Sequence, residues 1–264
     1  MIANRGLSSG FEKRLTSKRL RALISLVGIC SFATIGSASV ESAHSTSTDE
    51  WVAMPSDLHW VRNAAEYKAL TQQIYAAATK ELEARVASGE FEGKRWGVSM
   101  DADETVLDNS LEAKERRGAE FRLDVWQDWC RRVEAPAVPG SVAFIRRVKA
   151  LGGNVAIVSN RSVMVQEATE ANLEKLGVPF DVVLLKDEAD EKEPRWELVE
   201  SGAAIAGLEA FEIVMYFGDN IKDFPKLTQG LASDGAATEF EEFGRKFFVL
   251  PNPVYGSFAS NSKL

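Results

Sequence analysis

Short apolar runs that alternate with helical segments constrain the fold of this chain more than any other feature of the sequence. The runs with the length of buried strands are residues 96–100, 154–158, 182–185, 213–217 and 247–250. Between them, residues 141–151 and 162–176 place apolar side chains at helical spacing, and glycine follows each of these two segments. This alternation predicts an α/β fold, with a Rossmann-like parallel sheet and helices on both faces.

Two segments outside the alternation are expected to form a small helical subdomain. Residues 57–87 repeat apolar side chains mostly three and four positions apart, which predicts a helix before the first strand. Residues 111–139 are charged and mostly helical in pattern, with Trp126 and Trp129 embedded among them. Because this insertion follows the first strand, we expect it to form a cap over the end of that strand. Residues 57–264 are therefore predicted to form one domain.

The first 38 residues have the pattern of a secretory signal peptide. A basic segment precedes the uncharged apolar run 23–35, and the small residues up to Ala38 offer a cleavage site after that position. The run is short for a membrane span, which needs about 20 residues, so an uncleaved anchor is the less favoured alternative. Residues 39–56 begin as a Ser/Thr-rich stretch and are expected to form a flexible linker. We therefore expect a periplasmic or secreted protein.

The two cysteines bear on anchoring and on disulfides. Acylation at Cys30 is the less favoured alternative to a cleaved signal, because Ile29 stands where a lipoprotein signal has a small residue. Cys130 is alone after the expected cleavage, so no internal disulfide is possible. Two cysteines and two histidines in the whole chain also argue against a zinc site.

The charge of the expected mature chain is strongly acidic. Six Lys/Arg and one Glu lie in the first 38 residues, which leaves 25 basic and 38 acidic residues and a net charge near −13. Such a chain is a poor partner for polymeric nucleic acid. Small phosphorylated metabolites are compatible with it, since a bound metal ion offsets their charge.

Polar residues that can bind ligands or take part in catalysis follow four of the predicted strands. In chain order they are Asp101 and Asp103; Ser159, Asn160 and Arg161; Lys186 and Lys192; and Asp219 with Asp223. Ligands of open α/β sheets bind beyond the carboxyl ends of the strands, so these side chains are expected to share one site. A carboxylate can attack phosphorus, and a second carboxyl can protonate the leaving oxygen. The set suits phosphoryl transfer with Mg²⁺, which prefers carboxylates and phosphate oxygens.

Each signature alone has a plainer explanation. The acidic run from Asp101 has some spacing of a calcium loop, but Val106 stands where that loop needs glycine. Ser159 with Asn160 is typical of a helix N-cap, and Gly218 with its following Asp is typical of a turn. Lys192 alone is typical of a solvated surface charge. Their occurrence in order at successive strand ends favours a common site.

Two acidic signatures together resemble those of class C acid phosphatases, which belong to the haloacid-dehalogenase-like (HAD-like) superfamily. They are D101-A-D-E-T-V-L-D-N and G218-D-N-I-K-D-F. The similarity runs from about residue 60 to 256 and includes V158-S-N-R, K192-E-P-R and L250-P-N-P-V-Y-G. It is greatest to the outer-membrane lipoprotein e branch, which implies a HAD-like phosphatase domain and acid phosphatase or 5′-nucleotidase activity.

The resemblance implies roles for the residues at the strand ends. Asp101 is expected to be the nucleophile and Asp103 the general acid and base. Ser159 is expected to bind the phosphoryl group, with Asn160 and Arg161 beside it.

The lysine and the metal ligands follow from the same resemblance. Lys192 rather than Lys186 takes the phosphate-binding place, because K192-E-P-R matches the K-x-x-R of the family. The implied ligands of Mg²⁺ are Asp101, the backbone carbonyl of Asp103, and Asp219, with Asp223 supporting them.

The implied substrates are phosphomonoesters, above all nucleoside monophosphates. The family has aromatic residues that pack on the base of such a substrate, and Trp126 and Tyr255 match them. The alternative for Trp126 is a role in the core of the helical insertion. Family members are often homodimers. A second hypothesis for the activity is phosphate transfer to an alcohol acceptor. A non-catalytic binding or storage protein is a third, which the intact Asp101 disfavours, since plant storage relatives can lose the nucleophile.

Overall fold

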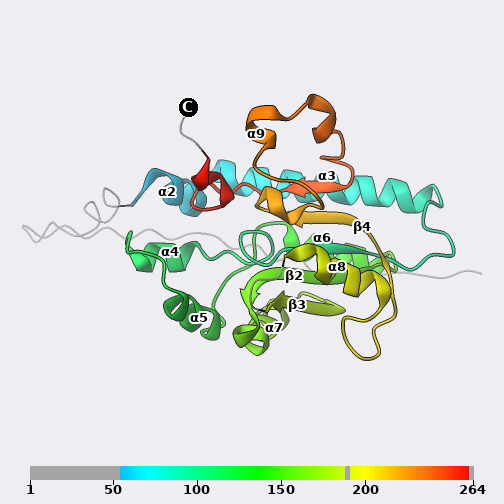
Figure 1. Cartoon of the computed structure of the whole chain (residues 1–264), viewed down its shortest axis with the longest axis horizontal. Helices are drawn as coiled ribbons and strands as arrows, with labels where there is room; N and C mark the ends of the chain where they lie inside the picture. The colour runs from blue at the N-terminus through cyan, green and yellow to red at the C-terminus, as the bar shows by residue number, and fades with distance from the viewer. Residues whose placement is uncertain (1–53, 188–190, 262–264) are drawn as a thin grey trace, which may run out of the picture. The chain divides into compact units, whose positions relative to one another are not determined.

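The computed structural model describes residues 54–187 and 191–261, and within them five strands form a parallel sheet (Figure 1). The strands are β1 (Trp96–Met100), β2 (Asn154–Ser162), β3 (Val182–Lys186), β4 (Glu212–Gly218) and β5 (Phe247–Val249). Their order across the sheet is β3-β2-β1-β4-β5, so β1 is central. Val98 of β1, for example, is in register with Val155 on one side and Met215 on the other. The predicted parallel α/β sheet is confirmed.

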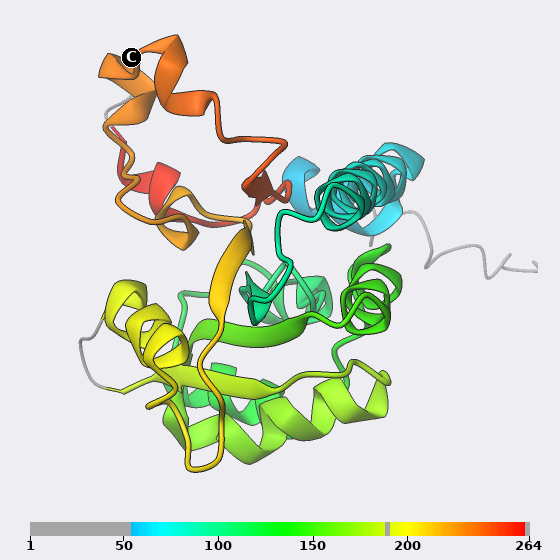
Figure 2. The same ribbon diagram turned by 90° about the vertical axis from the view of Figure 1, so that its right-hand side faces the viewer.

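Helices cover both faces of this sheet, as predicted. The helices of the described residues are α2 (Ser56–Asn63), α3 (Ala65–Ala87), α4 (Ser110–Arg116), α5 (Leu123–Arg131), α6 (Ser141–Ala150), α7 (Gln166–Lys175), α8 (Lys192–Ser201) and α9 (Leu231–Asp234). Figure 2 shows α8, in yellow, on one side of the sheet, and α3 and α6, in cyan and green, on the other. The insertion after β1 carries α4 and α5.

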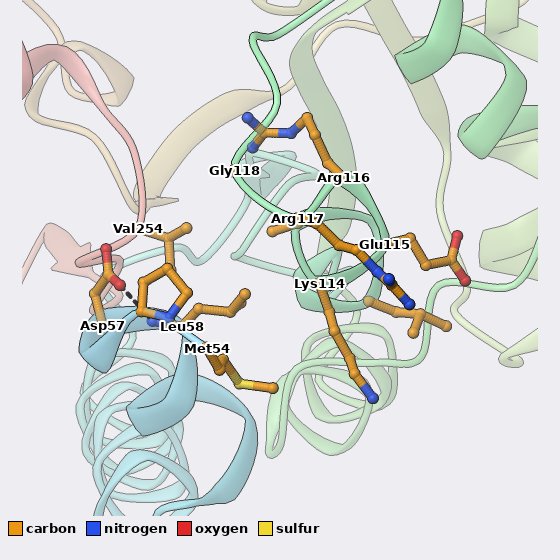
Figure 3. Close-up of a pocket in the computed structure, with 12 residues that line it drawn as sticks. Met54, Asp57, Leu58, Lys114, Glu115, Arg116, Arg117, Gly118 and Val254 are labelled. Atoms are coloured by element: carbon orange, nitrogen blue, oxygen red, sulfur yellow. Dashed lines mark hydrogen bonds between the residues drawn. The ribbon is translucent and has the colours of Figure 1, made fainter. Parts of the chain in front are cut away.

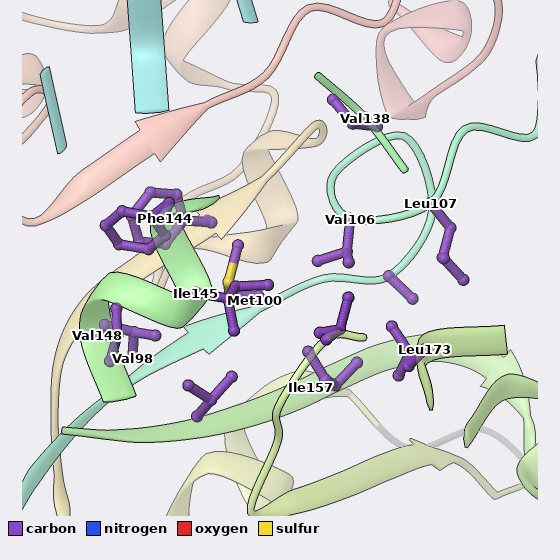
Figure 4. Close-up of a cluster of buried hydrophobic side chains, with 14 of the residues drawn as sticks. Val98, Met100, Val106, Leu107, Val138, Phe144, Ile145, Val148, Ile157 and Leu173 are labelled. Carbon is purple, nitrogen blue, oxygen red and sulfur yellow. The ribbon is translucent and has the colours of Figure 1, made fainter. Parts of the chain in front are cut away.

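Alternating side chains of the strands supply the two halves of the core. Val98 and Met100 of β1 point to the face covered by α3 and α6, where Phe144 and Ile145 pack on them (Figure 4). On the opposite face, Trp196 of α8 belongs to a second buried cluster. Burying each large apolar side chain stabilises the fold by about 1.5–3 kcal/mol. The central strand is therefore fixed from both sides, and its carboxyl end is a rigid platform.

The N-terminal helical segment differs from its prediction. Residues 57–87 were expected to form one helix, but Ala64 has extended backbone angles and separates α2 from α3. The break changes the direction of α2, so that Arg62 donates a hydrogen bond from Nη1 to Oγ of Ser110 in α4 at 2.9 Å. Tertiary contact with the insertion thus overrides the continuous helical pattern.

The described residues include no helix with the length and apolar character needed to cross a membrane. The predicted signal peptide, residues 1–38, and most of the predicted linker lie outside the described residues.

Candidate active site

The carboxyl ends of β1, β2 and β4 open onto a cavity of about 510 Å³, called the catalytic cavity below. These strands are neighbours in the sheet, so the residues that follow them meet at one edge. The predicted site residues that line it are Asp101, Asp103, Trp126, Ser159, Asn160, Asp219, Asp223 and Tyr255. Two more, Lys192 and Arg161, are buried against its acids.

Asp101 follows β1 directly and is fixed at the sheet edge by its own backbone. Its N–H donates to the carbonyl oxygen of Phe217 in β4 at 2.9 Å. Lys192, the first residue of α8, places Nζ 2.6 Å from Oδ1 of Asp101. Burial raises the pKa of the Asp101 carboxyl to about 7, against the opposing effect of the nearby ammonium. The side chain is thus oriented by a cation and shielded from water.

Asp101 also belongs to a cluster of three acids. Asp101, Asp219 and Asp223 each bring one carboxylate oxygen to within 4.8 Å of the others. Lys192 also contacts Oδ1 of Asp223, at 2.7 Å. Burial, followed by repulsion from the two neighbouring acids, raises the pKa of Asp219 well above its ordinary value. Oxygen donors at this spacing suit a hard divalent cation, whose charge would offset that repulsion, so the residues fit a divalent metal.

The turn after β4 determines the position of Asp223. The N–H of Asn220 donates to Oδ2 of Asp223 at 2.8 Å, and Oδ1 of Asn220 accepts from the N–H of Lys222 at 3.1 Å. A Cβ at Gly218 would lie 2.2 Å from the Cβ of Asp223. The last residue of β4 must therefore be glycine for Asp223 to pack against the strand.

The four acids of the run after β1 divide into two pairs. Asp101 and Asp103 line the catalytic cavity, whereas Glu104 and Asp108 do not. Glu104 is buried, and its Oε1 accepts from the N–H of Asn109 at 2.8 Å. Oδ1 of Asp108 accepts from the N–H of the first residue of α4 at 2.8 Å. The second pair thus closes the loop that presents the first.

Arg161 was predicted beside the phosphate, and the structure places its guanidinium behind Asp103. Nε and Nη2 of Arg161 lie 2.8 Å and 2.7 Å from Oδ1 of Asp103. Burial alone would disfavour the cation, but Asp103 keeps the pKa of Arg161 above its ordinary value. Ser159, by contrast, lies at the cavity wall, as does Asn160.

Two aromatic side chains from distant segments flank the same cavity. Trp126 is in α5 and packs against Phe121, with ring centroids 6.2 Å apart. Tyr255 is 40 % exposed, and Asn252 links its loop to Asp219 by hydrogen bonds. Nδ2 of Asn252 donates to Oδ2 of Asp219 at 2.7 Å, and its Oδ1 accepts from the N–H of Tyr255 at 3.4 Å. Both rings therefore border the cavity that contains the acids.

Comparison with known proteins identifies the family. The family model described as HAD superfamily, subfamily IIIB (acid phosphatase) matches residues 23–258. The chain belongs to this family of acid phosphatases. The protein is accordingly a phosphomonoesterase.

Solved structures agree with this acid phosphatase assignment. The chain is similar to the class C acid phosphatase from Bacillus anthracis, with 32% identity and a TM-score of 0.67 over 80% of this chain and 86% of that one. A second structure of the Bacillus anthracis enzyme, with tungstate bound, matches equally well. Among curated proteins, the chain is 26% identical to the stem 28 kDa glycoprotein of Glycine max, over 75% of this chain and 71% of that protein. It is 27% identical to a stem 31 kDa glycoprotein of the same plant, over 57% of this chain and 53% of that protein.

Arg195 is a buried cation of the acid phosphatase site to which the sequence patterns gave no role. Arg195 in α8 donates from Nη1 to the carbonyl oxygen of Ser159 and from Nη2 to Oδ1 of Asn160 at 2.8 Å. It therefore orients the end of β2. Arg195 lies three residues after Lys192, which places both on one face of α8, and that spacing was the available signal.

A second cavity of the phosphatase, of about 630 Å³, adjoins the first (Figure 3). It lies between α2 and α4, and Met54, Leu58 and Lys114 are among its lining residues. Arg116 and Val254 line both cavities. The second cavity contains none of the acids that follow the strands, so the chemistry belongs to the first.

Proposed function

We propose that the protein is a Mg²⁺-dependent acid phosphatase that hydrolyses nucleoside monophosphates through an aspartyl-phosphate on Asp101. The observation that carries the proposal is the composition of the catalytic cavity. Its lining includes Asp101, Asp103 and Ser159. The rings of Trp126 and Tyr255 line the same cavity. Acids and a hydroxyl suit a phosphate, and the rings suit a flat base.

In the first step, a carboxylate oxygen of Asp101 forms a bond to phosphorus as the ester P–O bond breaks. The electron pair of that bond passes to the leaving oxygen, which takes a proton from Asp103. Lys192 holds the other oxygen of Asp101 and supplies positive charge beside the transferring group. Ser159, which lines the cavity, would donate its hydroxyl hydrogen to a phosphoryl oxygen.

In the second step, water attacks the phosphorus of the aspartyl-phosphate. Asp103 takes a proton from this water, and the electron pair of the breaking bond returns to the carboxylate of Asp101. Inorganic phosphate leaves, and both acids regain their starting protonation states. The same two side chains therefore serve both steps.

The metal ligands are proposed from the acid cluster. Asp101, Asp219 and the backbone carbonyl of Asp103 would hold Mg²⁺, which supplies positive charge to the phosphate oxygens when bound. Both oxygens of Asp223 already accept, from Lys192 and from the N–H of Asn220. Asp223 is therefore better suited to supporting the ligands than to replacing them.

Two observations favour a small phosphate ester as the substrate, and the two rings favour a planar leaving group. The cavity volume of about 510 Å³ is in the range typical of small-molecule sites, which is about 300–1,000 Å³. The similar enzyme from Bacillus anthracis has been solved with tungstate, a tetrahedral oxyanion of the phosphate type. Base stacking on the two rings would add about 1–3 kcal/mol of binding energy.

Steady-state turnover tests this proposal. Activity on a nucleoside monophosphate should vanish in excess chelator and return with Mg²⁺. The kcat/KM for that substrate should exceed the value for an aliphatic phosphate of similar leaving-group pKa. Full activity in chelator would contradict the metal requirement, and equal kcat/KM values would contradict the nucleotide assignment.

We also propose export through the predicted signal peptide, with a mature chain that begins at Ser39. The support is the sequence pattern of residues 1–38, with small residues before the cleavage point. Intact mass of the protein purified from the periplasm or medium of its host tests this. A mature chain that begins at an acylated Cys30 would contradict it.

A further inference from the structure

One carboxylate oxygen of Asp103 carries all the hydrogen bonds of that side chain. Oδ1 accepts from Nε of Arg161 at 2.8 Å and from Nδ2 of Asn109 at 2.8 Å. It also forms an ion pair with Nη2 of Arg161 at 2.7 Å. Within the residues that the structure describes, Oδ2 of Asp103 makes no hydrogen bond. The side chain is 17% exposed and lines the catalytic cavity, so the oxygen without donors is the one available to a substrate.

The two donors to Oδ1 are themselves held from several elements. The side chain of Arg161 is 1% exposed, and its Nη1 donates to Oγ1 of Thr169 in α7 at 3.2 Å. Oδ1 of Asn109 accepts from Nη2 of Arg161 at 3.1 Å and from Nε1 of Trp129 in α5 at 2.8 Å. The donors therefore have little freedom, and Asp103 is oriented by groups that are already fixed.

The geometry differs from the arrangement that best stabilises an arginine–carboxylate pair. That arrangement is bidentate, with two parallel bonds from the guanidinium to the two oxygens of the carboxylate. Here both nitrogens of Arg161 converge on a single oxygen of Asp103. Burying a guanidinium is costly unless its donors are satisfied. Asp103, Thr169 and Asn109 accept from Arg161, so the guanidinium is held in this position. In this position it leaves Oδ2 of Asp103 open.

We propose that Arg161 and Asn109 are positioning residues that dedicate Oδ2 of Asp103 to proton transfer. The inference rests on the proposed role of Asp103 as the general acid. As the ester P–O bond breaks, its electron pair passes to the leaving oxygen, and the proton on Oδ2 moves to that oxygen. Oδ1 accepts two hydrogen bonds and lies against the guanidinium of Arg161, so it cannot carry the proton, and the acid presents the proton in one orientation only. A misplacement of about 1 Å costs on the order of 10²-fold in rate.

Leaving groups of different basicity test the proposal without relying on overall activity. A dinitrophenyl phosphate needs no proton to release its phenolate, whereas an alkyl phosphate does. For Arg161→Lys and for Asn109→Ala, kcat/KM should fall on the order of 10²-fold with the alkyl ester and much less with the dinitrophenyl ester. Arg147→Lys is the matched control, because it makes the same substitution at an exposed arginine of α6 that pairs with Glu83 at 2.7 Å and is not part of this network. In this control variant, any change in kcat/KM should be the same for the two esters.

Asp103→Asn, measured on the same two esters, separates failure of this inference from failure of the proposed function. If Asp103→Asn discriminates between the esters while Arg161→Lys and Asn109→Ala lower both equally, Arg161 and Asn109 are merely structural and the inference is overturned. If Asp103→Asn itself lowers both esters equally, Asp103 is not the acid and both conclusions fall. The proposal is supported if all three variants discriminate between the esters and the Arg147→Lys control does not.

Discussion

Lys192 and Asp101 form a buried ion pair, with Nζ 2.6 Å from Oδ1, although they are 91 residues apart in the chain. The same ammonium reaches Asp223, at 2.7 Å. Burial alone would disfavour the charged lysine, but the two carboxylates keep its pKa above the ordinary value. One cation therefore joins α8 to residues that follow β1 and β4.

Replacing Lys192 by Met should destabilise the metal-free protein by about 3–5 kcal/mol, because buried carboxylates lose their cation. Urea unfolding in chelator measures this, and Mg²⁺ should restore part of the loss. Lys149→Met is the control. It breaks a half-exposed pair with Asp181 at 2.6 Å and should cost at most about 1 kcal/mol. Equal stabilities of Lys192→Met and the parent in chelator would contradict the role given to this cation.

Mg²⁺ should stabilise the protein in a pH-dependent way. Burial raises the pKa of Asp101 to about 7, so the metal-free folded state binds this proton more tightly than the unfolded chain does. That contribution to stability is complete below the unfolded pKa of about 4 and is lost as pH rises through about 7. The metal competes with the proton. The rise in Tm on adding Mg²⁺ should therefore be larger at about pH 7 than at about pH 4.

Thermal unfolding with Mg²⁺ and with chelator at both pH values checks this linkage. Asp219→Asn, which removes a proposed ligand, should shrink the rise in Tm at the higher pH. A rise that is the same at both pH values would show that the metal binds elsewhere.

Removing either aromatic ring should affect nucleotides selectively. Trp126→Ala or Tyr255→Ala should raise KM for a nucleoside monophosphate by about 5- to 150-fold, since stacking is worth about 1–3 kcal/mol. Stacking is similar in ground and transition states, so kcat should change little. An aliphatic phosphate, which cannot stack, should be nearly unaffected. Equal losses on both substrates, with the fold intact by circular dichroism, would assign the rings to structure alone.

The sequence predicted the parts of this molecule that depend on periodicity and local spacing. The predicted strand 96–100 matches β1 in full, and Asp101 and Asp103, which follow it, line the catalytic cavity. Alternation of apolar residues along β1 fixes its two faces, and strand order then brings β2 and β4 beside it. The break at Ala64 was missed, because it depends on contact between Arg62 and the insertion.

Side-chain direction at the ends of strands was harder to predict than position. The family resemblance implied that Arg161 lies beside the phosphate, yet its guanidinium turns to Asp103 and Thr169. That choice depends on where α7 packs, which no local pattern encodes. Arg195 was left unassigned for the same reason: its partners are a carbonyl oxygen of β2 and the amide of Asn160.

The central claim is that Asp101 carries the phosphoryl group during turnover, and chemical trapping tests it most directly. Asp103→Asn should still be phosphorylated by a dinitrophenyl phosphate, which needs no general acid, but should lose the phosphate slowly. Acid quench, borohydride reduction and peptide mass spectrometry then locate the acyl-phosphate. We expect homoserine at position 101 in this variant and none when Asp101 is also replaced by Asn. A trapped phosphoryl group on any other residue, or full turnover by Asp101→Asn free of host phosphatase, would contradict the account.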